Sequence, residues 1–431
     1  MNRLKIAFAK NSFFILLAFF SVQGFAQTNP EGIFKSNVHT VRFHSSHRGL
    51  PIYNVNSGDQ LQLDFDDLDN DVKSYYYTYQ LCDYNWQPVD ISTMDYIKGF
   101  TQVRISDYQF SSIAYTKYTH YTASLPDQSS VPTRSGNYLL KVFLDGDTTN
   151  LVFTRRFFVV DAKTKVSAQV VPTISLQDNH QRVQFTVGVG GLNAFSAGQQ
   201  VKVMVLQNYR WDNAQGIDVE PTYVRNNVLE YNTDNNFVFP AGNEWRWVDI
   251  RSLSLRTGLI DSFASNKTST DVYMRAEGDR SSHKYVYYTD QDGLYNISTI
   301  ESNITPAWQN DYATVHFKFA PPNHQPFPDQ DVYIIGQLTD YQFNDNTKMV
   351  FNQAKGVYEA SVFLKEGYYD YDYLLVNKKD PTQSSLMDGD HFETENNYTV
   401  FVYYRSFNDQ SDQLVGIATI NSLTDQKGVS F

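Results

Sequence analysis

The chain has 431 residues, a formal net charge of −12 at pH 7 and a single cysteine, Cys82. The negative charge excludes a global electrostatic attraction to nucleic acid or to an anionic membrane face, and one cysteine excludes an internal disulfide. The length predicts two to four domains. The 31 Tyr and 30 Phe residues favour strands, because aromatic side chains suit pleated, half-buried surfaces.

Residues 1–26 have the three parts of a cleavable signal peptide. Basic residues without any acid precede the apolar run 12–20, and Gly24 and Ala26 stand at positions −3 and −1 before Gln27. The run is shorter than the roughly 20 residues that a membrane-spanning helix needs. The residue directly after the cleavage point is Gln27 rather than Cys, which argues against a lipoprotein anchor. We therefore expect an exported chain without a transmembrane helix.

Residues 27–162 are predicted to form an N-terminal β-sandwich. Apolar and polar residues alternate from Leu61 to Phe65, as in a strand with one buried face. Asp145-Gly146-Asp147 predicts a hairpin turn, because Gly and Asp tolerate a positive φ. Short strands with turns between them are typical of a sandwich. Further strands are predicted at 75–81, 115–125, 138–144 and 151–160.

A linker at 161–166 leads into a predicted middle β domain, residues 163–304, and then into a third unit, residues 305–431. Strands of the middle domain are predicted at 167–174, 182–189, 200–208, 237–239, 245–250, 271–276 and 285–289. Strands of the third unit are predicted at 312–319, 331–336, 356–364, 368–376 and 399–404. The sequence thus predicts an all-β chain of tandem sandwiches.

The third unit resembles the immunoglobulin-like "early-set" modules that precede glycan-active enzymes and form glycogen-binding domains. The resemblance rests on VYIIGQLTDY, MVFNQAKGVYEASVFL and EGYYDYDYLLV. Sugar-binding members carry a Trp just after the first strand, where this chain has Tyr341. The resemblance therefore implies the fold rather than sugar binding.

Motifs of catalysis are absent from the sequence: it has no G-x-S-x-G, H-E-x-x-H, P-loop or G-x-G-x-x-G pattern. We expect no enzyme activity and no cofactor, although paired carboxylates for glycoside hydrolysis stay an open alternative. Cys82 lies in a strand-like segment, which favours a buried, inert thiol over a reactive one.

Two patterns could hold a metal, and we expect neither to do so. His44 and His47 have a spacing that suits ligation on a helix, but their surroundings indicate strand or loop. The Asp64–Asp71 run alternates carboxylates, as calcium loops do, yet Val72 and Thr78 stand where the Gly and Glu of an EF-hand belong. We interpret the run as a solvated acidic turn, with a calcium loop as the alternative.

Two segments, 207–213 and 242–247, place Arg beside Trp among Asn residues. This composition suits protein interfaces, since these side chains bury much area and still make polar contacts. The alternative is structural: Asn and Arg tie down a loop, and Trp fills the core. The predicted partner-binding residues are Asn208, Arg210, Trp211, Asn243, Trp245 and Arg246.

The same segments, QNYRWDNA and FPAGNEWRWVDIRSL, resemble signatures of the plug-protein family of the type IX secretion system. LDFDDLDNDVKSYYYTYQLCDYNWQP, KGFTQVRISDYQFSSIAYTKYTHYTASLP and RSGNYLLKVF extend the resemblance over nearly the whole mature chain, in order. One difference is Tyr209, where a small residue is expected.

The resemblance implies a subunit that docks on the large outer-membrane β-barrel translocon and closes it when no substrate is engaged. It implies a place in the periplasm, attached peripherally to the outer membrane, with one copy per translocon. Two other functions stay open. One is a glycan-binding or glycan-processing surface protein. The other is an outer-membrane barrel, which the terminal Phe431 favours and the charged Lys427 and Asp425 disfavour.

Overall fold

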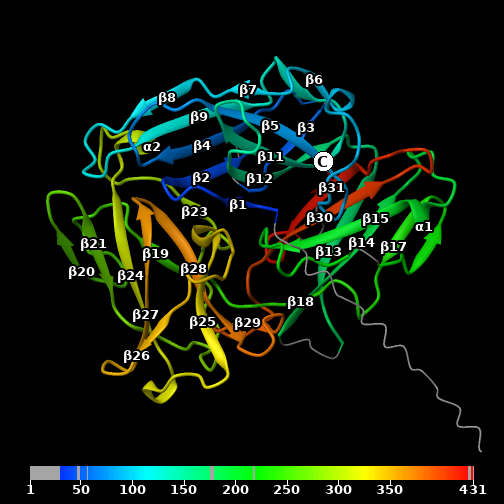
Figure 1. Cartoon of the computed structure of the whole chain (residues 1–431). Helices are drawn as coiled ribbons and strands as arrows, with labels where there is room; N and C mark the ends of the chain where they lie inside the picture. The colour runs from blue at the N-terminus through cyan, green and yellow to red at the C-terminus, as the bar shows by residue number, and fades with distance from the viewer. Residues whose placement is uncertain are drawn as a thin grey trace, which may run out of the picture.

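The computed structural model describes residues 30–45, 49–55, 57–174, 179–216, 219–425 and 429–430. The predicted signal peptide, His47, Lys427 and Phe431 lie outside these residues. Strands make up 46% of the structure and helices 4%, in several antiparallel sheets, which confirms the prediction of multiple β-sandwiches. Figure 1 shows the first sandwich across the top, the second at the right and the third at the lower left. No helix among the described residues is long and apolar enough to cross a membrane.

The first sandwich pairs a sheet of order β1-β12-β11-β5-β7, with β3 beside β12, against a sheet of order β2-β4-β9-β8. Tyr75, Tyr77, Tyr79 and Leu81 alternate into the core along β5, as the period of a strand dictates. The elements are β1 (Gly32–Ile33), β2 (Val38–His44), β3 (Ile52–Asn54), β4 (Leu61–Asp67), β5 (Tyr75–Cys82), η1 (Thr93–Asp95), β6 (Ile97–Gly99), β7 (Val103–Arg104), β8 (Asp107–Phe110), β9 (Thr119–Leu125), β10 (Ser130–Pro132), β11 (Gly136–Leu144) and β12 (Leu151–Val160).

The second sandwich pairs a sheet of order β13-β14-β17-β16, with β18 beside β14, against a sheet of order β15-β30-β31-β32. Its core joins Val, Phe and Tyr side chains of both sheets. The elements are β13 (Lys165–Pro172), β14 (His180–Gly188), α1 (Ala197–Gln200), β15 (Val201–Gln207), β16 (Tyr223–Arg225), β17 (Val228–Tyr231), β18 (Val238–Pro240), β30 (Asn397–Tyr404), β31 (Gln413–Asn421) and β32 (Val429–Ser430).

The third sandwich lies between β18 and β30 in the chain. Its sheets run β19-β28-β23, with β25 and β29 beside β28, and β20-β21-β24-β27-β26, with β22 beside β24. The elements are β19 (Arg246–Asp249), β20 (Ile260–Ser265), β21 (Thr270–Met274), β22 (Glu277–Gly278), β23 (Tyr295–Asn296), α2 (Pro306–Gln309), β24 (Tyr312–Ala320), η2 (Pro322–His324), β25 (Gln330–Ile335), η3 (Gln337–Thr339), β26 (Val350–Asn352), β27 (Val357–Lys365), β28 (Tyr368–Asn377) and β29 (Ser384–Leu386).

The sheets divide the strands differently from the linear domains expected at 163–304 and 305–431. β15 pairs with β30 from Val201↔Tyr404 to Gln207↔Tyr398, and the two strands share one core with β13 and β14. β19 pairs instead with β28. The third sandwich is thus inserted into the second, because strand pairing joins segments that are far apart in the sequence.

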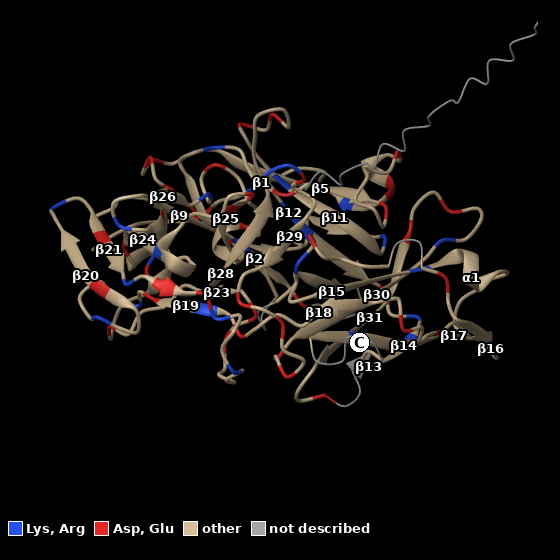
Figure 2. Cartoon of the chain, turned by 90° about the horizontal axis from the view of Figure 1, so that it is seen from below, with Lys and Arg blue, Asp and Glu red and all other residues tan. Residues whose placement is uncertain are grey.

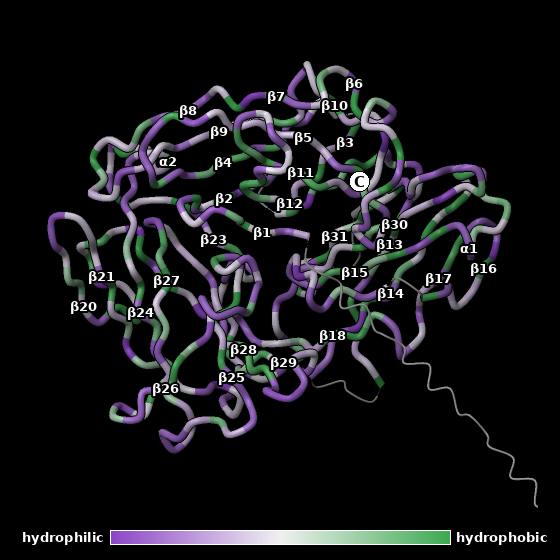
Figure 3. Tube along the Cα trace, in the orientation of Figure 1, coloured by the Kyte–Doolittle hydropathy of each residue, from purple (hydrophilic) through white to green (hydrophobic). Residues whose placement is uncertain are grey.

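Two local expectations also need correction. Residues 285–289, expected as a strand, are irregular, and the Tyr285 hydroxyl donates to the backbone oxygen of Glu393 at 3.0 Å. Asp64, Asp66 and Asp67, expected in a solvated turn, lie within β4 and are buried. Figure 3 shows hydrophobic and hydrophilic residues mixed along the chain. Strands β5 and β24 alternate buried and partly exposed residues, whereas β12 and β30 are buried on both faces because their two sheets also pack against each other.

Candidate functional site

The first predicted partner-binding segment directly follows β15 and is held by internal contacts. Asn208 is buried: its Nδ2 donates to Oδ1 of Asn396 at 2.8 Å, and its Oδ1 accepts from the Asn397 backbone N–H at 2.8 Å. Arg210 donates through two nitrogens to the carboxylate of Asp212, at 3.1 and 2.5 Å. These contacts tie the segment to the start of β30 and fix its turn.

Trp211 joins the second sandwich to the first. Its half-buried ring meets the Trp86 ring edge-on at a centroid distance of 5.1 Å. The Arg156 guanidinium lies over both rings, 4.5 Å from the Trp211 centroid and 4.9 Å from the Trp86 centroid. A buried cation over aromatic faces contributes about 0.5–2 kcal/mol, so Trp211 stabilises the junction of the two sandwiches.

The second predicted segment leads into β19 and is more deeply buried. Trp245 and Arg246 are each 4% exposed. Arg246 donates to Asp388 at 2.8 and 2.6 Å and to Glu277 at 2.8 Å, which neutralises a charge that burial would otherwise make costly. Asn243 donates to the Asp388 backbone oxygen at 3.2 Å. These contacts agree with the structural alternative, and partner binding by these residues stays a prediction.

A cleft of about 670 Å³ lies where the three sandwiches meet. Tyr209 and Trp211 line it from the second sandwich, and Tyr341 and Phe343 line it from the third. On its wall Arg155 of the first sandwich donates to both carboxylate oxygens of Asp340 at 3.1 Å. The sequence pointed to Tyr209, Trp211 and Tyr341 separately, and the fold brings them to one cavity.

Tyr341 contributes its ring to this cleft while its hydroxyl is engaged elsewhere. The hydroxyl donates to the Gly293 backbone oxygen at 3.0 Å, and the ring meets Trp245 edge-on at 6.3 Å. Burial raises the pKa of Tyr341 well above its ordinary value. Tyr341 is therefore uncharged near neutral pH and lines the cleft with its aromatic ring. Its hydroxyl proton is not available to an acid–base reaction at that pH.

A buried polar network joins the first and third sandwiches. Asp66 of β4 pairs with Lys365 of β27 at 2.5 Å, and it also accepts from His120 at 2.7 Å and from the Tyr312 hydroxyl at 2.7 Å. Burial opposes the ionised form of Asp66, but Lys365 and His120 outweigh it and lower the pKa of the carboxyl. Asp67 pairs with Lys73 at 2.8 Å. These carboxylates have protein partners and do not converge on a metal site.

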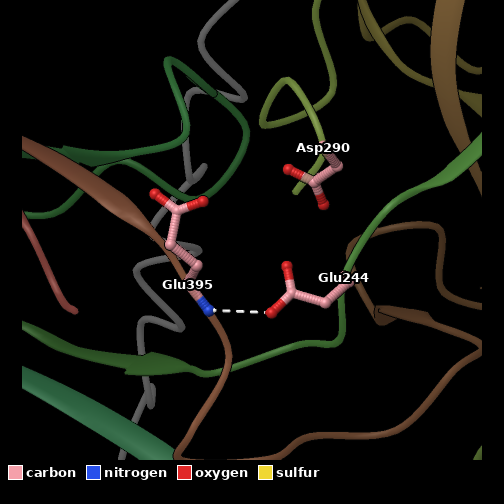
Figure 4. Close-up of side chains that lie close together, drawn as sticks. All are labelled: Glu244, Asp290 and Glu395. Carbon is pink, nitrogen blue, oxygen red and sulfur yellow. Dashed lines mark hydrogen bonds between the residues drawn. The ribbon is translucent and has the colours of Figure 1, made fainter. Parts of the chain in front are cut away.

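Within the described residues, the one group of carboxylates able to hold a metal together is Glu244, Asp290 and Glu395. One oxygen of each lies within 4.8 Å of the others, and the three side chains point toward a common space (Figure 4). Asp290 accepts from the Trp245 backbone N–H at 2.6 Å, and Glu244 accepts from the Glu395 backbone N–H at 3.1 Å.

Burial is the largest cause that raises the pKa of each carboxyl in and beside this group. It raises the pKa of Glu244 to about 7, and it raises the pKa of Asp290 and Glu395 as well. It also raises the pKa of Asp292 to about 8, and repulsion from Glu395 adds to this shift. Burial disfavours the charged form of a carboxyl group, and the hydrogen bonds and the Arg280 guanidinium near this group do not offset that effect.

The sequence motifs missed this acidic group, although a local signal was present. Asp290-Gln291-Asp292-Gly293 alternates carboxylates and ends in Gly, which is the pattern that Asp64–Asp71 lacks. Glu244 and Glu395 are far away in the sequence, and only the fold brings them to Asp290.

Comparison with protein families decides what kind of domain the first sandwich is. Residues 38–161 match the family described as "Type 9 secretion system plug protein 1st domain". This first domain belongs to the plug-protein family. The match confirms the resemblance found in the sequence over these residues, and the plug family is a structural and transport family rather than an enzyme family.

A solved structure extends the likeness beyond the plug domain. A hypothetical protein from Parabacteroides merdae is 28% identical, with a TM-score of 0.86, over 91% of this chain and 98% of its own. An α-2-macroglobulin from Escherichia coli is 10% identical over 90% of this chain and 28% of its own, with a TM-score of 0.16, and carries no argument. No curated protein matches the chain.

The plug domain exposes an apolar patch at its outer edge. Tyr108 and Phe110 of β8, together with Ile113 and Tyr115 of the following loop, form what we call the β8 patch, with exposures of 38%, 47%, 59% and 60%. Among the strands that the structure describes, β8 pairs only with β9, so its other edge has no strand beside it. Acidic and basic residues are interspersed over the three sandwiches (Figure 2). Among the described surfaces of the plug domain, the β8 patch therefore suits contact with a protein partner.

Proposed function

We propose that the chain is a periplasmic plug subunit that docks on the large outer-membrane translocon of the type IX secretion system and closes it when no substrate is engaged. The single observation that carries the proposal is the match of residues 38–161 to the plug-protein family. On this proposal one copy serves each translocon, attached peripherally to the periplasmic side of the outer membrane. The third sandwich would be the immunoglobulin-like, early-set-like module.

The packing of the sandwiches supports an obstructing role. A plug must keep its shape under load, and each junction here contains buried contacts. Asp66 and Lys365 join the first sandwich to the third, while Phe158 stacks on Phe401 of the second at 4.5 Å. The Tyr403 hydroxyl donates to Asn137 at 2.9 Å across the same junction. Such contacts resist relative motion of the sandwiches.

Docking can be tested by affinity purification. The tagged protein would be isolated from detergent-solubilised outer membranes of the cells that make it, and the proteins that come with it would be identified. We expect a very large barrel at near-equal stoichiometry, in greater amount when cargo export stops. Recovery of the protein alone under every condition would contradict the proposal.

Substitutions in the β8 patch would test whether this surface contacts the barrel. We expect Tyr108→Ser with Phe110→Ser to reduce recovery of the barrel about tenfold or more, because truncating aromatic anchors costs about 2 kcal/mol or more at an interface centre. The matched control is Phe195→Ser, since Phe195 is 94% exposed on the second sandwich. Equal recovery with both variants would remove the patch from the docking surface.

The cleft favours glycan binding as a second candidate function. Tyr209, Trp211 and Tyr341 line it, and aromatic faces stack on sugar rings. A glycan array would test this candidate, and Trp211→Leu would be expected to lower any signal. Uniform absence of binding across the array would exclude it and leave the plug proposal untouched.

A further inference from the structure

The acidic group lies where the chain crosses between the second and third sandwiches. Glu244 stands on the outgoing segment between β18 and β19, and Glu395 stands on the returning segment between β29 and β30. Asp290 belongs to the loop before β23 of the third sandwich. Figure 4 shows the three carboxylates on these separate segments, facing one another. A ligand bound by all three carboxylates would therefore connect the two segments that link the sandwiches with a loop of the third sandwich.

No cation of the described residues forms a direct ion pair with the group. Among the ion pairs of the described residues, none involves Glu244, Asp290 or Glu395. Arg280 lies nearby, but its guanidinium donates to Asp388 at 2.8 Å, to the Tyr288 hydroxyl at 2.6 Å and to the Glu244 backbone oxygen at 2.7 Å. Three carboxylates at such separations repel one another strongly in a partly buried site.

Glu244 supplies an independent observation. Its side chain is fully buried, with 0% exposure, and its Oε2 atom has no hydrogen-bond partner in the part of the chain that the structure describes. Its Oε1 atom accepts from the Tyr285 hydroxyl and from the Glu395 backbone N–H. The unpartnered oxygen points into the space between Asp290 and Glu395 (Figure 4). A buried carboxylate oxygen without a partner costs free energy, so its orientation toward that space points to a ligand.

We propose that Glu244, Asp290 and Glu395 bind a Ca²⁺ ion that ties the second and third sandwiches together. The donors are all oxygens, which suit a hard cation, and the group contains no nitrogen or sulfur ligand of the kind that zinc favours. Ca–O distances of about 2.3–2.6 Å allow ligand oxygens up to about 5 Å apart, which accommodates the limit of 4.8 Å found here. Water and backbone oxygens complete the 6–8 ligands that Ca²⁺ takes.

The competing occupant is a proton shared between Glu244 and Asp290. A shared proton would give the Oε2 atom a hydrogen-bond partner without any metal. In that case the site would not bind Ca²⁺. The two occupants predict opposite effects of Glu244→Gln: the amide would remove a calcium ligand, whereas it would replace a protonated carboxyl with little loss.

The test uses the full mature chain, stripped with a chelator and titrated with CaCl₂ by isothermal titration calorimetry. We expect one site with a dissociation constant below about 1 mM, and at least about tenfold weaker binding of MgCl₂, which demands shorter and more regular coordination. Thermal unfolding should shift upward by a few degrees at about 10 mM CaCl₂ relative to chelator, since a ligand that binds only the folded state stabilises it.

Glu244→Gln and Asp290→Asn are expected to weaken calcium binding at least about tenfold and to abolish the thermal shift. The matched control is Glu393→Gln, an exposed residue that removes the same charge two positions from Glu395. If Glu244→Gln does not fold, Glu395→Gln serves in its place, because Glu395 is only half-buried. Absence of binding heat and of a thermal shift in the wild-type chain, or full retention of both in the variants, would overturn the proposal.

Discussion

Lys365 reaches from the third sandwich into the first and pairs with Asp66 at an N–O distance of 2.5 Å, with both side chains 1% exposed. The Lys365 ammonium also lies over the Tyr118 ring, 4.1 Å from its centroid, and donates to the Ala307 backbone oxygen at 2.7 Å. This buried pair is the polar centre of the junction between the two sandwiches.

Lys365→Ala should therefore destabilise the chain severely. Removing the ammonium leaves the Asp66 carboxylate buried without its cation, which costs about 3–5 kcal/mol. Urea unfolding would measure the loss. Lys355→Ala is the control, because Lys355 pairs with Glu359 at the surface and should contribute at most about 0.5 kcal/mol. Equal stability of the two variants would contradict a structural role for the buried pair.

His120 should make the stability of this junction depend on pH. Burial opposes the charged imidazole, but hydrogen bonds to Asp64 and Asp66 outweigh it and raise the pKa of His120. A raised pKa in the folded chain contributes stability that is fully present below the unfolded value of about 6.5 and is lost as the pH rises through the folded value. The stability difference between wild type and His120→Gln should thus shrink from pH 6 to pH 9. A constant difference would show that the imidazole stays neutral.

Trp211→Ala should lower the free energy of unfolding by about 2–3 kcal/mol, less than the 3–5 typical of a fully buried Trp. The change removes the ring contacts with Trp86 and with the Arg156 guanidinium. Chemical denaturation monitored by tryptophan fluorescence would measure it. Phe195→Ala, at a 94% exposed position, should change stability by no more than about 0.5 kcal/mol. A neutral Trp211→Ala that nevertheless abolishes docking would favour the partner-binding interpretation instead.

Cys82 should resist alkylation in the folded chain. The side chain is 0% exposed, and burial raises the pKa of its thiol to about 12, which leaves almost no reactive thiolate near neutral pH. Reaction with an alkylating reagent should become complete only in denaturant, which serves as the positive control. Rapid labelling of the native chain would show that the thiol is accessible.

Comparing Gly293→Ala with Gly58→Ala should separate the stability cost of a steric clash from the cost of backbone strain. Gly293 has φ +80, and an added Cβ would lie 2.8 Å from the Trp245 ring. Gly58 has φ +70 and nothing within 4 Å of such a Cβ. Gly58→Ala should cost about 1–2 kcal/mol from strain alone, whereas Gly293→Ala should cost clearly more. Equal losses in thermal or urea unfolding would mean that the Trp245 ring moves aside freely.

Strands with strong local patterns were predictable from the sequence. The strand predicted at 151–160 is β12 with the same bounds, and Asp145-Gly146 makes the expected turn with positive φ at both residues. The pairing of β15 with β30 was not predictable, because alternation shows which face of a strand is buried but not which strand lies beside it. Irregular residues 285–289 were mistaken for a strand because their aromatic composition mimics one.

The site was predictable only in part, for a related reason. The sequence singled out the Arg-Trp segments as candidate partner-binding sites, yet composition does not reveal that Arg246 faces Asp388 and Glu277 in the interior. Tyr341 lies beside Tyr209 and Trp211 in one cleft only because the third sandwich packs next to the second. Likewise the group around Glu244 depends on segments that the insertion brings together, and the only local signal, the alternation at Asp290 and Asp292, does not point to Glu244 or Glu395.

The insertion of the third sandwich also dictates the order in which the chain can fold as it is made. β15 gains its partner β30 only after every residue of the third sandwich has been synthesised. The first and third sandwiches can close early, while the second waits with Val201–Gln207 as an open, apolar edge. Until β30 is present, the apolar side chains of β15 therefore lack one of their neighbours, whereas in the finished protein every residue of this strand except Lys202 is buried.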